Sequence, residues 1–282
     1  MIELGKYNRL EAFRKTEHGW YLIDDSRSEE VLLPNRFVPE KLKEGDALDV
    51  FIFNDSEDRV TATTQTPDIV RGTFACLQVA EVTKFGAFMK WGMDRDLLVP
   101  FGEQRRPMEE GDWYIIHMYL DEKTDRLVGT NKWAKYVERE NISLTVGEEV
   151  DLLIAEGSNL GVKVIINNQY QGLIFQNEIF HNIHRGDKRK GYIKEIRADG
   201  KIDVSLQKQG YANAISDISN KVLTEIKDRG GFLNLTDKSA PGEIYAQLEM
   251  SKKNFKKAVG GLYKQKLIRI ENDGIYLVGK KK

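Results

Sequence analysis

Residues 97–112 have the sequence L-L-V-P-F-G-E-Q-R-R-P-M-E-E-G-D, and two other stretches of the chain share its framework. Residues 31–46 (V-L-L-P-N-R-F-V-P-E-K-L-K-E-G-D) and 173–187 (L-I-F-Q-N-E-I-F-H-N-I-H-R-G-D) also place a Gly-Asp pair after an apolar run and a fixed gap. In all three stretches the glycine lies eleven positions after the start of the gap, which is Pro34, Pro100 or Phe175. This repetition predicts a tandem array of one small domain.

Two further landmarks keep their distance from this framework. A glycine lies 14 or 15 residues before each gap, and a basic residue lies 14 or 15 residues after each Gly-Asp glycine. Each repeat therefore spans roughly 70 residues, which is close to the smallest size that folds alone. The landmarks are Gly19, Gly86 and Gly161 upstream, and Arg59, Arg126 and Lys201 downstream.

Short runs of alternating apolar and polar residues predict strands in every repeat. Five short strands with the longest connection between the third and the fourth are typical of the small barrel called the OB fold. In the first repeat we expect strands at 7–16, 20–24, 30–33, 47–53 and 59–63. In the second and third we expect them at 73–82, 87–91, 97–99, 113–119 and 126–129, and at 149–155, 162–167, 171–175, 190–195 and 201–206.

After residue 209 the apolar period changes from two to about 3.6, which indicates helices. One apolar face ends at Gly230-Gly231, a second helix begins with Pro241 in its first turn, and Ser251 caps a third that runs to about Gln265. Two short apolar runs, 267–270 and 275–278, then flank a hairpin turn, and residues 280–282 form a tail that we expect to be disordered. The face of the first helix consists of Ala214, Ile218, Val222 and Ile226.

The predicted fold is therefore mainly β with an α+β C-terminal part. We expect OB-type barrels at residues 1–66, 67–139 and 140–209, followed by a winged helix at 210–282, since three helices and a hairpin are typical of that relative of the helix-turn-helix. These domains account for all 282 residues and leave no room for a catalytic domain. The four histidines show no metal-ligand spacing and no P-loop is present, so we expect no enzyme, cofactor or metal.

The composition points to a reduced cytoplasmic protein. A single cysteine, Cys76, excludes a disulfide framework. We see neither a signal peptide nor a run near the roughly 20 apolar residues of a membrane span. The net charge is only −1, but residues 211–282 carry 14 basic against 8 acidic side chains, a net charge of +6, and residues 1–210 carry −7. The C-terminal quarter is therefore the part that suits a nucleic acid.

The second repeat contains two aromatic residues on either side of a glycine bend. Phe85 and Phe88 are three residues apart, and Gly86 permits the bend that would place both on one face. With Lys84 and Lys90 beside them, they would form a stacking platform for single-stranded nucleic acid. The alternative is that one or both rings fill the barrel core.

The same repeat contains, in order, V-x-x-V-T-K-F-G-A-F-M-K, D-L-L-V-P-F, E-G-D and D-R-L-V-G-T-N-K. In this it resembles the S1-type RNA-binding domain. In that family the two aromatic residues, the charged pair that opens the last strand and the basic residue that closes it lie on the RNA-binding face. The resemblance departs at Pro100, where the family usually has a histidine. It implies RNA contacts from Phe85, Phe88, Asp125, Arg126 and Lys132.

The other two repeats match less well, and either could be structural only. The first keeps rings at both platform positions, His18 and Tyr21, but residues 1–66 carry 9 basic against 14 acidic side chains, a net charge of −5 that would repel phosphate. The third has Leu160 and Lys163 at the platform positions. It offers instead the basic run Lys188, Arg189 and Lys190 as a candidate for RNA contact.

In the C-terminal domain, four lysines share a face of the third predicted helix, opposite an apolar face of Phe255, Val259 and Leu262. This helix enters the major groove in helix-turn-helix relatives, and lysines suit phosphates better than base edges. The alternative is a solvated helix face. The lysines are Lys252, Lys253, Lys256 and Lys257.

Residues 248–268, L-x-M-S-K-K-N-F-K-K-A-V-G-G-L-Y-K-Q-K-L-I, follow the three repeats and lead into the predicted hairpin. This arrangement resembles the conserved virulence factor B family of bacteria. The resemblance implies a non-catalytic regulator that binds single-stranded RNA and acts after transcription. A second hypothesis is a DNA-binding transcription regulator that uses the winged helix, with the barrels as sensor or interaction domains. A third, an S1-containing ribonuclease, is disfavoured for lack of a catalytic domain. No membrane and no small-molecule substrate are expected as partners.

Overall fold

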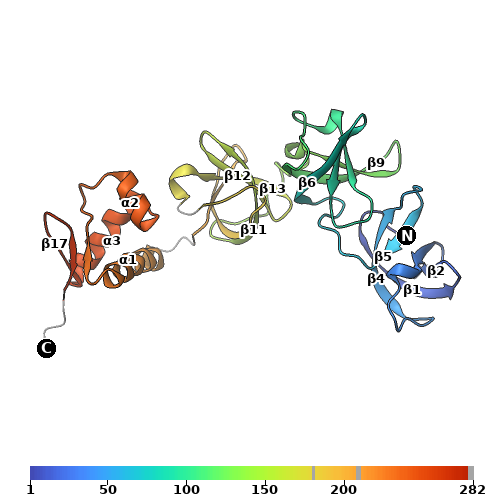
Figure 1. Cartoon of the computed structure of the whole chain (residues 1–282), viewed down its shortest axis with the longest axis horizontal. Coiled ribbons are helices and arrows are strands. Elements are labelled where there is room, and N and C mark those ends of the chain that lie inside the picture. Colours follow the sequence, from blue (N-terminus) through green and yellow to red (C-terminus); the bar gives the residue numbers. More distant parts are fainter. Residues whose placement is uncertain (180–181, 208–210, 279–282) are drawn as a thin grey trace. The chain divides into compact units, whose positions relative to one another are not determined.

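The protein is described by a computed structural model that covers residues 1–179, 182–207 and 211–278 (Figure 1). The chain divides into two compact units, one formed by Met1–Glu138 with Asn167–Tyr170, and the other by Arg139–Ile166 with Gln171–Lys282. The first unit holds two β barrels, and the second holds a third barrel and a helical domain. The predicted fold class is confirmed. The predicted tail at 280–282 lies outside the described residues.

The first barrel is closed, with the strand order β1-β2-β3-β5-β4. All of its strand pairs are antiparallel except β3 with β5, which meet in parallel at Leu32 and Thr61. Alternate residues such as Leu22, Val50 and Ile52 point inward and are fully buried. The strands are β1 (Tyr7–Lys15), β2 (Gly19–Ile23), β3 (Glu30–Pro34), β4 (Ala47–Asn54) and β5 (Val60–Thr63).

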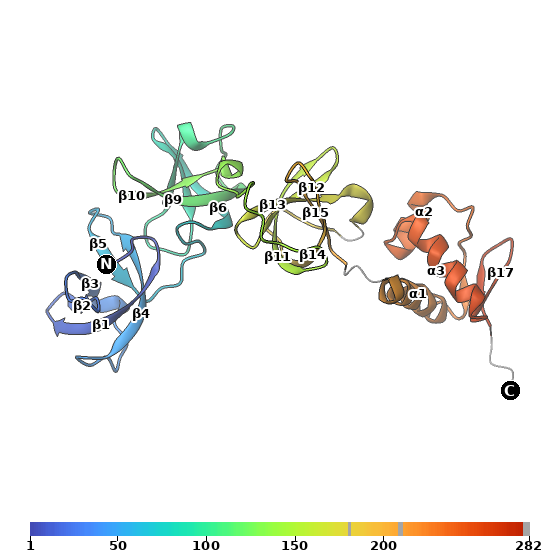
Figure 2. The same ribbon diagram turned by 180° about the vertical axis from the view of Figure 1, so that it is seen from behind.

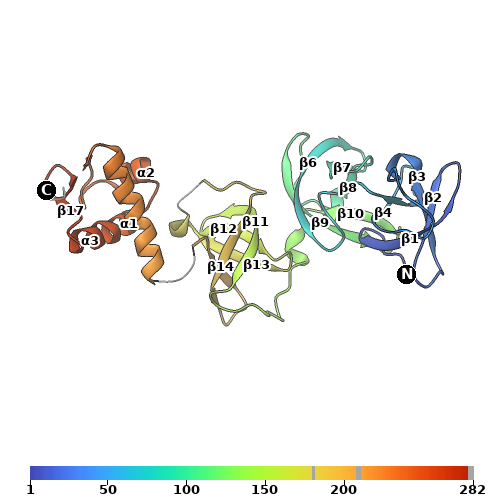
Figure 3. The ribbon, with the colours of Figure 1, turned by 90° about the horizontal axis from the view of Figure 1, so that it is seen from below.

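The second barrel has equivalent strands, labelled in Figure 3, but they form a five-stranded sheet of order β10-β9-β6-β7-β8 and not a closed ring as in the first. Its apolar core also takes in Phe51 and Phe53 of the first barrel, and the rings of Phe51 and Trp91 meet edge to face with centroids 5.9 Å apart. The first barrel therefore contributes two rings to the core of the second, beside a separate core of its own. The strands are β6 (Phe74–Thr83), β7 (Gly86–Lys90), β8 (Leu97–Pro100), β9 (Trp113–Asp121) and β10 (Arg126–Thr130).

The third barrel is closed in the order β11-β12-β13-β15-β14, the same topology as the first (Figure 2). Short 3-10 turns that the strand pattern did not predict follow the third strand of each barrel, at Asn35–Phe37, Phe101–Glu103 and Gln176–Glu178. The strands are β11 (Glu149–Ser158), β12 (Gly161–Ile166), β13 (Tyr170–Phe175), β14 (Lys188–Ile196) and β15 (Ile202–Ser205).

The repeated glycine has the same role in all three barrels. Gly19, Gly86 and Gly161 each open the second strand with φ between 147° and 152°, a region that favours glycine. An added Cβ would lie 2.0–2.3 Å from a backbone carbonyl oxygen of the third strand. The spacing found in the sequence therefore marks a point where two strands approach too closely for any side chain.

The helical domain is a winged helix of three helices and a small sheet of order β16-β18-β17. Ser251 caps the third helix as predicted, since its Oγ accepts a hydrogen bond from the Asn254 backbone amide at 3.2 Å. The sequence did not predict β16, which has only two residues. The elements are α1 (Tyr211–Asp228), β16 (Phe232–Leu233), α2 (Pro241–Leu248), α3 (Lys252–Lys264), β17 (Ile268–Ile270) and β18 (Ile275–Leu277).

Two of the predicted domain limits, 66 and 139, fall in connections between barrels, and 209 lies outside the described residues. All three limits stay predictions. Within the part of the chain that the structure describes, no helix is both long and apolar enough to cross a membrane. No cluster of three or more His, Cys, Asp or Glu side chains among these residues is placed to hold a metal ion.

Candidate nucleic-acid interface

Neither Phe85 nor Phe88 belongs to the buried core of the second barrel. Phe85 lies in the turn between β6 and β7 and is 61% exposed, and Phe88 is half-buried on β7. Its strand neighbours Ala87 and Met89 are fully buried, so alternation along β7 directs Phe88 to the outer face. The bend at Gly86 brings Phe85 to that face as well, as the sequence predicted.

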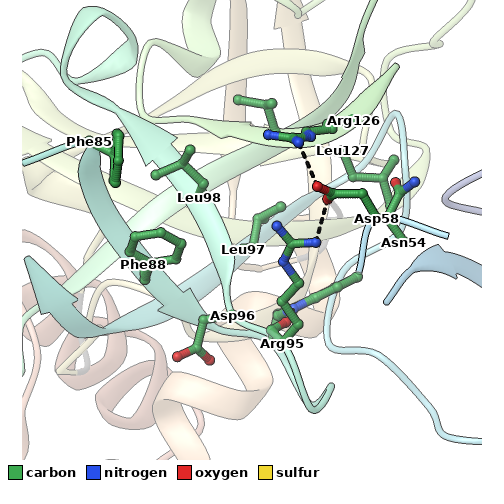
Figure 4. Close-up of a pocket in the computed structure, with 12 residues that line it drawn as sticks. Asn54, Asp58, Phe85, Phe88, Arg95, Asp96, Leu97, Leu98, Arg126 and Leu127 are labelled. Carbon is green, nitrogen blue, oxygen red and sulfur yellow. Dashed lines mark hydrogen bonds and ion pairs between the residues drawn. The ribbon is translucent and has the colours of Figure 1, made fainter. Parts of the chain in front are cut away.

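Both rings line a pocket of about 280 Å³ on the first unit (Figure 4). Its walls come from β7, from the facing strands β8 and β10, and from the β4–β5 turn of the first barrel. The pocket thus combines aromatic, aliphatic and charged side chains in one small space. The lining residues are Asn54, Asp58, Phe85, Phe88, Trp91, Arg95, Asp96, Leu97, Leu98, Arg126, Leu127 and Val128.

Two arginines meet one carboxylate in this pocket. Arg95 Nη1 lies 2.6 Å from Asp58 Oδ1, and Arg126 Nη2 lies 2.5 Å from Asp58 Oδ2 (Figure 4). Hydrogen bonding from Arg95, together with the charge of both arginines, lowers the pKa of Asp58 against a smaller opposing effect of desolvation. The sequence pointed to Arg126 but not to Arg95 or Asp58.

The pocket also holds an acid that sequence reasoning missed. Asp96 lies just before β8 and lines the pocket with Phe88. Partial burial, with a smaller contribution from Glu81, raises the pKa of its carboxyl group. Asp96 opens the D-L-L-V-P-F motif, but the motif gave it no role, because its position on the face depends on the pairing of β7 with β8.

The remaining predicted residues of the second barrel do not line the pocket. The Lys84 ammonium is 5.1 Å from the centroid of the Phe85 ring, a cation–π contact. Lys90 is exposed at the end of β7, and Asp125 is exposed in the turn before β10 with a φ of 51°. Lys132 donates from Nζ to the backbone carbonyl of Gly102.

In the first barrel the predicted rings lie beside carboxylates. His18 is exposed, with Nε2 3.2 Å from Glu17 Oε1. The Arg14 guanidinium lies 3.8 Å above the Tyr21 ring and also pairs with Glu30 at 2.7 Å. The acidic charge predicted from the sequence is therefore close to the rings themselves, which disfavours phosphate at this face.

In the third barrel the basic run lies on β14, and two of its members have acidic partners. Arg189 pairs with Asp187 at 2.9 Å, and Lys190 pairs with Asp151 at 2.7 Å, a hydrogen bond that raises the pKa of Lys190. Lys188 is exposed at the start of the strand. None of the three lines the groove that this barrel presents.

That groove, of about 690 Å³, lies on the face equivalent to the pocket of the second barrel. Lys163 stands at the position of Phe88, Lys201 at that of Arg126, and the Arg197 guanidinium lies 5.5 Å from the centroid of the Phe175 ring. Alignment of the repeats placed Lys163 and Lys201 at these positions, but the sequence analysis did not make them candidates for RNA contact. The lining residues are Ser158, Asn159, Leu160, Lys163, Gln171, Gly172, Leu173, Phe175, Arg197, Lys201, Ile202 and Asp203.

The predicted lysine face of the winged helix lies on α3. Lys253, Lys256 and Lys257 are exposed, whereas Lys252 is half-buried and donates from Nζ to the Ser239 carbonyl oxygen at 2.8 Å. The opposite face is buried as predicted, with Phe255, Val259 and Leu262 all in the domain core. Lys252 therefore differs from the other three in its exposure, and its ammonium has a partner within the domain.

Comparison with known proteins agrees with this architecture. Residues 4–65 match the model of the S1 domain, and residues 220–277 match the model of the CvfB-like winged helix domain. The predicted resemblance to conserved virulence factor B is confirmed. The S1 match lies on the first barrel, although the aromatic motif is more complete in the second. An S1 domain and a winged helix in one chain indicate nucleic-acid binding, and neither matching model describes a catalytic domain.

Relatives align over most of the chain. Conserved virulence factor B of Staphylococcus epidermidis is 24% identical over 92% of this chain and 90% of its own length. The Bacillus subtilis protein YitL is 28% identical over 96% of this chain and 93% of its own. A solved multidomain protein with nucleic acid binding domains from Streptococcus pneumoniae is 22% identical, with a TM-score of 0.43 and 98% of each chain covered.

Proposed function

We propose that this protein is a non-catalytic regulator that binds single-stranded RNA and controls gene expression after transcription in the bacterial cytoplasm. One observation carries the proposal. Two aromatic side chains, Phe85 and Phe88, stand outside the barrel core and line one pocket with Arg95 and Arg126. Sites for single strands combine rings on which bases stack with positive charge along the backbone.

The proposal needs no single tight site. Linked modules raise one another's effective concentration, so weak contacts from several domains add up to useful affinity. The groove of the third barrel, whose Lys163, Arg197 and Lys201 each pair with a carboxylate, and the exposed lysines of α3 are further candidate contacts. The acidic first barrel is the least suited. Predicted limits at 66, 139 and 209 define these modules.

The α3 lysines also favour a second candidate function, a regulator that binds duplex DNA through the winged helix. Lys253, Lys256 and Lys257 lie on the helix that enters the major groove in helix-turn-helix relatives. Lysines at that place suit phosphates, which are common to DNA and RNA, so the charge alone does not separate the two functions.

A direct binding comparison tests the proposal. Fluorescence anisotropy would measure the affinity of the full chain for single-stranded RNA, single-stranded DNA and duplex DNA of matched length at two salt concentrations. We expect single-stranded RNA to bind most tightly, with an affinity that falls as salt rises. Tighter binding of duplex DNA would support the transcription regulator instead, and the absence of binding to all three would refute both functions.

A further inference from the structure

Arg126 differs from its equivalents in the choice of its acidic partner. In the first barrel Arg59 pairs with Asp55 of its own turn at 2.8 Å, and in the third Lys201 pairs with Asp199 of its own turn at 2.6 Å. Arg126 pairs instead with Asp58, which lies 68 residues earlier in the β4–β5 turn of the first barrel. The same repeated position therefore joins two domains only in the second barrel.

A second arginine also pairs with Asp58. Arg95, just before β8, binds the other carboxylate oxygen and also donates to the Asp55 backbone oxygen at 2.6 Å. Two planar guanidinium groups that each donate to a different oxygen of one anion form the arrangement that also suits a phosphodiester. The carboxylate is 37% exposed, so this point is reachable from the solvent.

The arginine pair and the stacking rings share one pocket. Figure 4 shows Phe85 and Phe88 on one side of Leu97 and Leu98, and Arg95 and Arg126 with Asp58 on the other. A strand whose base stacks on the rings would carry its backbone toward positive charge on the same face. In the free protein Asp58 balances one of these two positive charges.

We propose that Arg95 and Arg126 form a phosphate site beside the aromatic pair, and that Asp58 occupies this site as an internal competitor until RNA displaces it. The proposal rests on the proposed function, since it concerns how the second barrel receives a single strand. The phosphodiester takes both guanidinium groups, and the Asp58 carboxylate returns to solvent. The acidic first barrel thus lowers the affinity of its neighbour and limits binding to strands that also engage the rings.

Asp58→Asn is the substitution that isolates this effect. Asp58 has a φ of 60°, and asparagine tolerates that left-handed conformation better than most residues, so the turn is kept while the charge is lost. Glu44→Gln is the matched control, because Glu44 is an exposed acid of the same barrel and its loss changes the net charge equally. Binding of a short labelled oligouridylate would be titrated over a series of salt concentrations.

The expected results follow from competition between the Asp58 carboxylate and an RNA phosphate for Arg95 and Arg126. Asp58→Asn should tighten binding about 5-fold at low salt, the range of one exposed ion pair, and steepen the log-log salt slope by about 0.7 for one more phosphate contact. Glu44→Gln should do neither. Adding Arg95→Gln to Asp58→Asn should cancel the gain, because the second guanidinium of the site is then missing.

Weaker or unchanged binding by Asp58→Asn, relative to Glu44→Gln, would overturn the proposal and assign Asp58 to holding the arginines in place. If thermal unfolding shows that Asp58→Asn does not fold, Arg95→Gln alone decides: the proposal predicts a loss of affinity, and unchanged affinity overturns it. Phe85→Ala with Phe88→Ala is measured alongside. If that variant binds as the wild type does, the proposed function of the second barrel fails; if it binds weakly but Asp58→Asn gives no gain, only the competitor fails.

Discussion

The second and third barrels have equivalent strands in the same order, but they present different faces. The second builds a pocket of about 280 Å³ around two rings, and the third builds a groove of about 690 Å³ with Lys163 and Lys201 at the positions of Phe88 and Arg126. The fold is set by the inward residues and the repeated glycine, which the two barrels share. Function follows from the outward residues, which are free to differ.

The largest difference should appear in RNA binding. Phe85→Ala combined with Phe88→Ala should weaken binding of single-stranded RNA by about 1 to 3 kcal/mol for each lost stack, without loss of the fold. Leu160→Ala is the control on the third barrel, because Leu160 is 66% exposed at the position of Phe85 but has no ring. A similar loss of affinity in both variants would mean that stacking is not the difference between the two barrels.

The shared glycine gives the next effect, this time on stability. Gly86→Ala and Gly161→Ala should each destabilise their barrel by about 3 to 4 kcal/mol, since the new Cβ would meet a backbone oxygen at 2.0–2.3 Å. Tryptophan fluorescence should detect unfolding of the Gly86 variant, because all four tryptophans lie in the first two barrels (Trp20, Trp91, Trp113 and Trp133). Unfolding of the Gly161 variant should be followed by circular dichroism. Tolerance of alanine at either position would contradict the equivalence of the barrels.

Low pH should also destabilise the second barrel more than the third. Burial lowers the pKa of His117 from 6.5 to about 4, and its ring stacks on Tyr136 with centroids 4.2 Å apart. Because the unfolded state takes up a proton first, stability is full above pH 6.5 and falls as the pH drops toward 4, by about 2 kcal/mol at pH 5. The third barrel has Tyr192 at the equivalent position, which does not titrate in this range.

Urea unfolding followed by tryptophan fluorescence at pH 7 and pH 5 would measure this loss. His117→Phe should remove most of the pH dependence while leaving a similar side-chain volume in the core. An unchanged pH dependence in that variant would show that another group titrates.

The smallest expected effect is on the salt dependence of RNA binding. If the exposed lysines of α3 neutralise phosphates, Lys253→Gln and Lys256→Gln should each reduce the log-log salt slope for single-stranded RNA by roughly 0.7. Lys252→Gln should change it less, because its ammonium is held by the Ser239 carbonyl. Equal slopes in all variants would assign this face to solvent or to a protein partner.

Much of the fold was predictable from the sequence, and less of the site. Alternation located the strands to within a few residues, since each barrel buries one face of every strand. It could not locate β16, where two residues give no period, or the pairing of Asp58 with Arg95 and Arg126, which joins residues far apart in sequence. The sequence predicted RNA contact from the basic run Lys188–Lys190, but the basic side chains that line the groove of that barrel are Lys163, Arg197 and Lys201.

The central claim is that single-stranded RNA lies on the ring face of the second barrel. Ultraviolet crosslinking of oligouridylate to the full chain, followed by mass spectrometry of the crosslinked peptides, tests it directly. We expect a crosslink at Phe85 or Phe88 that is lost in the double alanine variant. Crosslinks confined to the third barrel and α3, with none at the ring face, would contradict it.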